Sequence, residues 1–538
     1  MLVRITIALF LLAVGVWAQP KPFVSNVWVA DNGDGTYKNP IIFADYSDPD
    51  VVRVGEDFYM TASSFNAAPG LPILHSKDLV NWRIINHVFH EQYPSDVFTK
   101  PQHGGGVWAP SIRFHEGEYY IYYGDPDFGI YMTKAKNPAG EWSKPLLVRQ
   151  AKGWIDPCPL WDDDGNAYLV HAFAGSRAGI KSILVVNKMS ADGTRLLDDG
   201  VMVFDGHETD STIEGPKFFK SGGYYYIFAP AGGVPTGWQL ALRSKNIYGP
   251  YEKKVVLAQG NTAINGPHQG ALIDTPMGEW WFIHFQDRGA YGRVVHLQPA
   301  AWKSGFPVIG TDPDGDGTGE PVLKHKKPNV GKTYPIETPQ DSDEFVGSTI
   351  GLQWQWHGNP QAEWAFPFPE KGILRMNSVQ LPDGYKNLWD LPNLLLKKFP
   401  AEEFSATAKV SVKPRFESER FGLVVMGIDY SLIGVTFRGG KTYISQATAK
   451  DADKGSLETV ISTQLLTSNE FYLRVNVRAR AVCNFSYSRD GKSFTTIGEP
   501  FMARQGRWIG AKVGFVYTRA ARFNDAGTAD IDWFRFQK

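Results

Sequence analysis

Three acidic residues carry the chemistry that this sequence offers most clearly. Each precedes a Pro or a Gly-Pro pair, as in Ser47-Asp48-Pro49, Ile155-Asp156-Pro157 and Ile213-Glu214-Gly215-Pro216. Hydrolysis of a glycosidic bond needs one carboxyl group to protonate the leaving oxygen and another to activate water or attack the sugar. A third carboxylate can raise the pKa of the acid and fix its orientation. Because glutamate has the longer reach, Glu214 is the preferred proton donor.

An internal repeat predicts that these acids occupy comparable positions. Each repeat opens with a polar or small residue, often followed by proline, and continues with alternating apolar residues, a Gly/Asp turn and an aromatic pair. The alternation around a short turn predicts a hairpin in each repeat. The five repeats are DPDVVRVGEDFYMTAS from Asp48, APSIRFHEGEYYIYYG from Ala109, DPCPLWDDDGNAYLVHA from Asp156, EGPKFFKSGGYYYIFA from Glu214 and HQGALIDTPMGEWWFIHF from His268.

Repeats of about 50 residues with roughly four strands each are typical of β-propeller blades. Five repeats therefore predict five blades. The first strand of a blade runs innermost, so the opening residue of each repeat is expected beside the central axis. Taken singly, each acid would be an ordinary turn or capping residue. Three acids at equivalent positions favour a functional pocket, because a purely structural ring would avoid bringing like charges together.

A second region follows a change of composition near residue 311. The stretch TDPDGDGTGEPVLKHKKPNVGKTYPIETPQ is rich in proline, glycine and charge, which predicts a linker over residues 311–340. Later runs such as SATAKVSV and FYLRVNVRA alternate without helical periodicity and predict a β-sandwich, concanavalin-like or jelly-roll-like. The predicted fold class is all-β: a five-bladed β-propeller catalytic domain over 37–310 and a β-sandwich accessory domain over 341–538.

The N-terminus reads as an export signal. In MLVRITIALFLLAVGVWAQP, Arg4 precedes an apolar run, and Val16-Trp17-Ala18 resembles a cleavage site. The run is shorter than the roughly 20 apolar residues that a membrane-spanning helix needs. Residues 1–18 are therefore predicted to be a signal peptide, and the protein is expected in the periplasm or outside the cell.

The amino-acid composition indicates which kinds of partner the protein is expected to bind. Aromatic residues make up 14% of the chain, which suits a β-sheet core and also sugar binding, because sugar C–H faces stack on aromatic rings. A net charge of −1 provides no electrostatic footprint for nucleic acid or an anionic membrane, so neither is an expected partner. Cys158 and Cys483 fall in different predicted domains, which indicates small buried thiols without a disulfide framework.

The chain resembles glycoside hydrolase family 43, five-bladed propeller enzymes that include α-L-arabinofuranosidases and β-xylosidases, many with a C-terminal β-sandwich. The resemblance spans nearly all of residues 37–538, and it implies that Asp48 is the general base, Asp156 the pKa modulator and orienting residue, and Glu214 the general acid. The family inverts configuration, so the base and acid carboxyl groups should stand roughly 6.5–9.5 Å apart, leaving room for water. Its most specific stretches are YSDPDVVRVGEDFYMTASSF, GGGVWAPSI, GWIDPCPLWDDDG, STIEGPKFFK, GPHQGALID and DEFVGSTIGLQWQWHGNP.

The resemblance also implies roles for residues around the acids. Trp108 matches an aromatic of the pocket wall, with blade packing as the alternative, and Phe65 lies in a loop that rims the pocket in similar enzymes. Arg293 matches an arginine that reaches sugar hydroxyls and the catalytic carboxylates, with a surface position as the alternative. The sugar-contacting loops themselves have no clear counterpart.

No cofactor is required in this interpretation, although a structural calcium ion on the propeller axis is a further expectation from the resemblance. In relatives, the histidine equivalent to His268 helps hold such a cation through water; a satisfied core histidine is the alternative. A second acidic pattern, Asp312, Asp314 and Asp316, imitates the start of a calcium loop. Its twelfth position is Leu323 and not glutamate, which argues against an EF-hand.

The preferred function is exo-acting, inverting release of terminal α-L-arabinofuranosyl residues from plant hemicellulose oligosaccharides. The alternative is a β-D-xylosidase, because the family changes between the two pentoses by small loop changes. A retaining hydrolase with an aspartate nucleophile and a non-catalytic carbohydrate-binding propeller stay open as further alternatives. The resemblance implies that the sandwich packs on the propeller and sends a loop toward the pocket, whereas Trp354, Trp356 and Trp364 could instead bind polysaccharide as a separate module.

Overall fold

The computed structural model describes residues 22–520 and 522–538, so the predicted signal peptide lies outside the described residues. Strands dominate this part of the chain, and the α-helix α1 (Gly175–Ala178) is a single turn. The 3-10 turns are η1 (Val97–Thr99), η2 (Gly289–Tyr291), η3 (Ala362–Trp364), η4 (Pro369–Lys371), η5 (Leu388–Asp390), η6 (Ala452–Lys454) and η7 (Ala479–Ala481). Across the described residues, none of the helices has both the length and the apolar character needed to cross a membrane.

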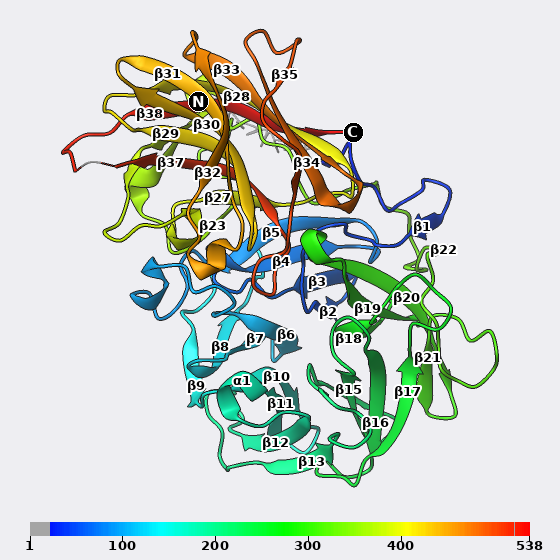
Figure 1. The fold of residues 1–538 in the computed structure, drawn as a ribbon. Coiled ribbons are helices and arrows are strands. Elements are labelled where there is room, and N and C mark those ends of the chain that lie inside the picture. Colours follow the sequence, from blue (N-terminus) through cyan, green and yellow to red (C-terminus); the bar gives the residue numbers. More distant parts are fainter. Residues whose placement is uncertain (1–21, 521) are drawn as a thin grey trace, which may run out of the picture.

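Five four-stranded antiparallel sheets follow one another along the chain and form a ring, which confirms the predicted five-bladed propeller (Figure 1). Blade one contains β2 (Asp50–Val54), β3 (Asp57–Thr61), β4 (Gly70–Ser76) and β5 (Trp82–Phe89). Blade two contains β6 (Trp108–His115), β7 (Glu118–Asp125), β8 (Gly129–Ala135) and β9 (Leu146–Gln150). Blade three contains β10 (Trp154–Trp161), β11 (Ala167–Phe173), β12 (Ile183–Met189) and β13 (Val201–Asp205).

The last two blades have the same strand order. Blade four contains β14 (Lys217–Ser221), β15 (Tyr224–Ala231), β16 (Trp238–Ser244) and β17 (Glu252–Leu257). Blade five contains β18 (His268–Asp274), β19 (Trp280–Asp287), β20 (Arg293–Lys303) and β21 (Phe306–Ile309).

Apolar side chains between neighbouring blades hold the ring together. Ile73 of blade one packs in a buried cluster with Ile121 of blade two, and an equivalent cluster joins Ile283 of blade five to Trp82 of blade one. Full burial of one such side chain contributes roughly 1.5–3 kcal/mol, so the alternating strand pattern supplies most of the inter-blade adhesion.

The segment before blade one closes the ring. Ile42 and Val295 exchange backbone hydrogen bonds of 3.3 and 3.1 Å, and the Tyr46 N–H donates to the carbonyl of Arg293 at 3.1 Å. The chain that leads to Asp48 therefore runs along the edge of β20 in blade five. This pairing fixes Asp48 and Arg293 beside each other although they are far apart in sequence.

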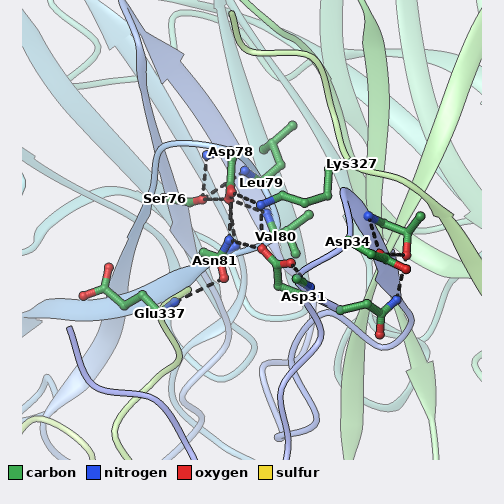
Figure 2. Close-up of polar contacts among 12 residues, drawn as sticks. Asp31, Asp34, Ser76, Asp78, Leu79, Val80, Asn81, Lys327 and Glu337 are labelled. Carbon is green, nitrogen blue, oxygen red and sulfur yellow. Dashed lines mark hydrogen bonds and ion pairs between the residues drawn. The ribbon is translucent and has the colours of Figure 1, made fainter. Parts of the chain in front are cut away.

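Residues of the predicted linker are fixed to the first blade. Strand β1 (Thr36–Lys38) pairs with β22 (Lys324–Lys326). Figure 2 shows the polar cluster beside this pair, in which the Lys327 ammonium lies 2.5 Å from the Asp31 carboxylate and 2.8 Å from that of Asp78. Asn81 donates to both carboxylates, at 2.9 and 2.8 Å. Both acids are buried, so Lys327 neutralises charge that water cannot reach.

The C-terminal region is a sandwich of two eight-stranded sheets, as predicted (Figure 1). One sheet contains β23 (Gln355–Trp356), β26 (Val379–Gln380), β27 (Leu395–Lys398), β29 (Arg420–Met426), β30 (Tyr430–Arg438), β31 (Lys441–Ala449), β32 (Thr459–Leu466) and β37 (Lys512–Arg519). The other contains β24 (Ala365–Phe368), β25 (Ile373–Asn377), β28 (Phe404–Lys413), β33 (Glu470–Arg478), β34 (Val482–Ser488), β35 (Thr495–Thr496), β36 (Phe501–Met502) and β38 (Thr528–Gln537).

Backbone hydrogen bonds join the sandwich to blade one. Ala68 and Trp356 exchange two such bonds, of 3.1 and 2.5 Å, and the side chain of Asn66 donates to the carbonyl of His357 at 2.7 Å. Trp354, Trp356 and Trp364 are buried, with 1%, 6% and 3% of their surface exposed. Rings enclosed in this way cannot stack on a polysaccharide, so the three tryptophans act in packing. Cys158 and Cys483 are buried free thiols, as expected.

Candidate active site

An uncommon backbone conformation marks the start of the first strand in every blade. Non-glycine residues rarely adopt positive φ, at a cost of roughly 1–3 kcal/mol each, and such residues cluster at functional sites. The non-glycine residues concerned are Asp48 (φ 55°), Ala109 (29°), Asp156 (58°) and Gln269 (44°), and Gly215 (57°) has the same conformation in blade four. The strand register agrees in blades one to four, where the residue two positions later opens the regular ladder, as in Asp50 opposite Thr61 and Lys217 opposite Phe228. In blade five the ladder resumes one residue after Gln269, at Gly270.

This register corrects one prediction. Glu214 and His268 are not at the same repeat position as Asp48 and Asp156 but one residue earlier, where blade two has Trp108. The prolines explain the offset, because Pro49, Pro157 and Pro216 follow directly after Asp48, Asp156 and Gly215. At Gly215 a Cβ atom would lie 2.6 Å from Cδ of Gln269, so glycine keeps this corner open. Glu214 therefore enters the pocket from the neighbouring backbone position.

The three acids nevertheless line one small cavity of about 80 Å³. Phe65, Trp108 and Arg293 line the same cavity, so six of the predicted site residues meet there. The complete lining is Asp48, Phe65, Trp108, Ala109, Ile155, Asp156, Glu214, Val234, Gln269, Arg293 and Trp508. Gln269, Val234 and Trp508 were not singled out from the sequence.

Asp48 is held by hydrogen-bond donors. Its Oδ2 accepts from the hydroxyls of Ser47 at 2.7 Å and Ser63 at 2.5 Å. Arg293 Nη1 lies 3.2 and 3.4 Å from the two carboxylate oxygens. Donors on both oxygens stabilise the ionised form of a carboxyl group, which is the form a general base requires.

Asp156 and Glu214 compete for one proton. Burial raises the pKa of Asp156 to about 7, although its Oδ2 accepts the Gly215 N–H at 2.7 Å. Burial and then the negative charge of Asp156 raise the pKa of Glu214 to about 8. No hydrogen bond joins the Glu214 carboxyl group to another described residue, whereas Asp156 accepts a backbone N–H. The proton therefore belongs on Glu214 at neutral pH, which leaves Glu214 in the form a general acid requires.

Arg293 is buried, with 7% of its surface exposed, and is not a surface arginine. Asp45 fixes its position, because Oδ1 of Asp45 accepts the Arg293 N–H at 2.9 Å. The other oxygen, Oδ2, accepts the N–H of Gly510 in the sandwich, also at 2.9 Å. One carboxylate thus joins the arginine of the pocket to a loop of the other domain.

That loop brings Trp508 to the pocket. The ring of Trp508 lies 6.0 Å from that of Trp108, and the guanidinium of Arg293 lies 5.9 Å from its centroid. The N–H of Ala511 donates to the carbonyl of Ala290 at 2.7 Å, which anchors the loop to blade five. The sandwich therefore supplies part of the pocket wall. This agrees with the sandwich loop that the family resemblance implied, although no residue pattern in the sequence indicates that the turn around Trp508 is that loop.

Phe65 and Trp108 form a second aromatic wall. Phe65 exchanges backbone hydrogen bonds of 3.0 and 3.2 Å with Val107, and its ring lies 6.4 Å from that of Trp108. The indole N–H of Trp108 donates to the carbonyl of Gly104 at 2.8 Å. Because its indole N–H is already hydrogen-bonded, the ring of Trp108 can offer a face for apolar contact with a sugar ring.

His268 lies fully buried next to the acids. Its Nε2 is 3.6 Å from Oε1 of Glu214, burial lowers its pKa to about 3, and neither ring nitrogen has a partner among the described residues. A neutral imidazole offers one nitrogen lone pair, which fits a contact to a cation through water. It does not fit a directly bound calcium ion, which takes six to eight oxygen ligands.

The acidic loop lies elsewhere. Asp312, Asp314 and Asp316 are the one group of three metal-ligand side chains within 4.8 Å of one another in the described part of the chain. Two of these three aspartates are exposed, and the Asp312 carboxylate accepts the N–H groups of Gly315 and Gly317 within the loop.

Comparison with known proteins now identifies the family. Residues 37–307 match the model of glycosyl hydrolases family 43. The chain belongs to this family. Residues 342–537 match the β-xylosidase C-terminal concanavalin A-like domain.

Several relatives align over most of the chain. A putative β-xylosidase of Xylanibacter ruminicola is 41% identical over 91% of this chain and 87% of its own length. A β-xylosidase of Formosa agariphila is 33% identical over 94% of this chain and 91% of its own length. A non-reducing end α-L-arabinofuranosidase of Bacteroides ovatus is 28% identical over 98% of both chains.

A solved structure has the same two-domain architecture. The xyloglucan-locus GH43B protein of Bacteroides ovatus superposes with a TM-score of 0.79 at 27% identity. The superposition covers 93% of this chain and 99% of the other.

Proposed function

We propose that this family 43 glycoside hydrolase removes terminal β-D-xylosyl residues from the non-reducing ends of hemicellulose oligosaccharides. The observation that carries the proposal is the meeting of Asp48, Asp156 and Glu214 at one small cavity, with the proton held on Glu214. Trp508 of the sandwich walls this cavity, which favours a pocket for a chain end over an open cleft. The protein is proposed to act after export, which suits a polysaccharide-derived substrate.

The mechanism assigns one task to each acid. Glu214 donates its proton to the glycosidic oxygen as the bond breaks, and Asp48 accepts a proton from the attacking water. Arg293 donates to the Asp48 carboxylate and faces the pocket, where its remaining N–H groups can donate to sugar hydroxyls. Asp156 holds the Glu214 pKa high by its charge.

Inversion of configuration follows if water attacks directly. The first sugar released from a β-xyloside should then be the α-anomer, which proton NMR detects within the first minutes of reaction. Appearance of the β-anomer first would show retention and would assign an aspartate as nucleophile.

The relatives favour xylose over the arabinose preference drawn from the sequence. The 41% and 33% identical relatives are both named as β-xylosidases. α-L-Arabinofuranosidase activity remains the second candidate, because the 28% identical relative with that name aligns along 98% of both chains. The test compares kcat/KM for nitrophenyl β-D-xylopyranoside and nitrophenyl α-L-arabinofuranoside. A higher value for the arabinofuranoside would reverse the ranking, and no activity on either would reject the proposal.

Calcium, if bound beside His268, is proposed to act as a structural ion held largely by water. Such an ion would stabilise the propeller axis, while proton transfer stays with the carboxyl groups. Chelation with EDTA should then lower the melting temperature with little change in kcat for enzyme that remains folded.

A further inference from the structure

Two larger hollows continue outward from the catalytic pocket. The first, called here the vestibule, has a volume of about 690 Å³, and the second, called the seam groove, about 740 Å³. The catalytic pocket and the vestibule share the walls Val234, Arg293 and Trp508. The vestibule and the seam groove share the walls His103, Trp389 and Asp453. The three hollows therefore form one series that starts at the catalytic acids.

The seam groove runs between the two domains. Residues 99–103 of the propeller form one wall, and Asp453 together with sandwich residues between 361 and 393 forms the other. The residues at its junction with the vestibule are well fixed, because the rings of His103 and Trp389 stack with centroids 3.5 Å apart. His103 Nε2 also lies 2.8 Å from the carbonyl oxygen of Trp389. This junction is built from both domains, so the groove exists only where they meet.

The groove walls suit a neutral, hydroxyl-rich chain. The walls carry amide side chains, including Gln361 and Gln380, together with the aromatic Tyr385. Amide groups both donate and accept hydrogen bonds, as sugar hydroxyls do. The charged wall residues are Asp383, Asp390, Asp453 and Lys100. Asp453 is paired with Arg507 at 2.8 Å and Asp383 with Arg522 at 3.1 Å, so the walls are close to neutral and offer a charged chain no net attraction.

The vestibule likewise offers no free positive charge to an anionic chain. Its Arg507 lies 2.8 Å from Asp453, and its Arg177 lies 3.3 Å from Asp127. Each guanidinium is therefore engaged by a carboxylate and is not a free clamp for an anion.

We propose that the seam groove binds the continuation of a neutral oligosaccharide whose terminal sugar occupies the catalytic pocket. The second sugar lies in the vestibule and the following sugars lie in the groove. Each hollow has a volume within the roughly 300–1,000 Å³ typical of small-molecule sites, and a disaccharide would leave the seam groove empty. This inference rests on the proposed function. Binding in the groove would make the enzyme selective for chains longer than two sugars.

The test adds bulk at the lip of the groove. Gln361 is exposed and lines the groove, whereas Glu363 is exposed two residues away and does not line it, so Gln361→Trp and Glu363→Trp form a matched pair. In the wild type, kcat/KM should rise about tenfold from xylobiose to xylotetraose, which corresponds to about 1.4 kcal/mol of added contact. Q361W should abolish this rise, E363W should keep it, and all three proteins should hydrolyse nitrophenyl β-D-xylopyranoside equally.

Two results would overturn the groove: a wild type with equal kcat/KM for both oligosaccharides, or a Q361W variant that behaves like E363W. Binding without turnover is tested by titrating xylotetraose, in a calorimeter, into E214Q protein that also carries Q361W or E363W. Loss of binding in Q361W alone would support the groove even if the nitrophenyl assays rejected the proposed function. A glucuronic-acid-substituted tetraose should gain no affinity over xylotetraose, and tighter binding would contradict the charge argument.

Discussion

Replacing Asp156 with asparagine should move the alkaline limb of the pH profile of kcat/KM to lower pH. In the wild type, burial and the Asp156 charge together raise the pKa of Glu214 from 4.5 to about 8. Asparagine retains an oxygen for the Gly215 N–H but carries no charge, so the contribution of burial stays and that of Asp156 is lost. The new limb should therefore fall between 4.5 and 8. At pH values above both limbs, the kcat/KM of D156N should fall below that of the wild type by about tenfold for each unit by which the Glu214 pKa has dropped.

The assay is kcat/KM for nitrophenyl β-D-xylopyranoside from about pH 5 to about pH 9, a range that spans the expected limbs. Asp163→Asn is the matched control, because the Asp163 side chain is 90% exposed in the turn between β10 and β11. This control should leave the profile of the wild type unchanged. A D156N profile with its alkaline limb unmoved, or moved to higher pH, would refute the electrostatic role of Asp156.

Two further predictions concern the sandwich loop and the linker. Trp508→Ala should raise KM about tenfold, because a wall of the pocket is lost. The melting temperature should change little, since the Trp508 side chain is 52% exposed. An unchanged KM would show that Trp508 is not part of the site. Lys327→Met should destabilise the fold by about 3–5 kcal/mol, because it strands two buried carboxylates, and Lys327→Arg should lose less. Burial alone would raise the pKa of Asp31, but hydrogen bonds from Asn81 and Lys327 lower it below 3.8. The stability that the ionised Asp31 carboxylate contributes to the fold is therefore present above about pH 4 and is lost as pH falls through the folded pKa. Acid unfolding of K327M should therefore begin at higher pH than in the wild type, and coincident unfolding curves would contradict the role of Lys327.

The sequence was sufficient to predict the repeat architecture. Alternating apolar residues around short turns set the strands, and the opening residues Asp48 and Asp156 lie at the pocket because each first strand is the innermost of its blade. The same pattern placed Glu214 one residue out of register, although the proline after Gly215 marks Gly215 as the true equivalent of Asp48 and Asp156. A one-residue offset changes the backbone position but not the pocket, because the long glutamate side chain still reaches it.

Trp508 and the seam groove could not be predicted in this way. Both depend on how two separately patterned domains pack together, and local periodicity carries no information on that contact. Asp45 illustrates the difficulty, since one of its oxygens accepts the N–H of Arg293 and the other the N–H of Gly510, which lies 465 residues further along the chain. The family resemblance implied that a sandwich loop reaches the pocket, but only the assembled structure shows that the loop carrying Trp508 is the one that does so.

The role of Glu214 as proton donor is tested most directly by the dependence of Glu214→Gln on the leaving group. A poor leaving group needs protonation, whereas an acidic phenol departs without it, so the loss should depend on the aglycone. We expect kcat/KM of E214Q to fall about 10²–10⁴-fold on xylobiose and only slightly on dinitrophenyl β-D-xylopyranoside. An equal loss on both substrates, or full activity on xylobiose, would contradict the assignment.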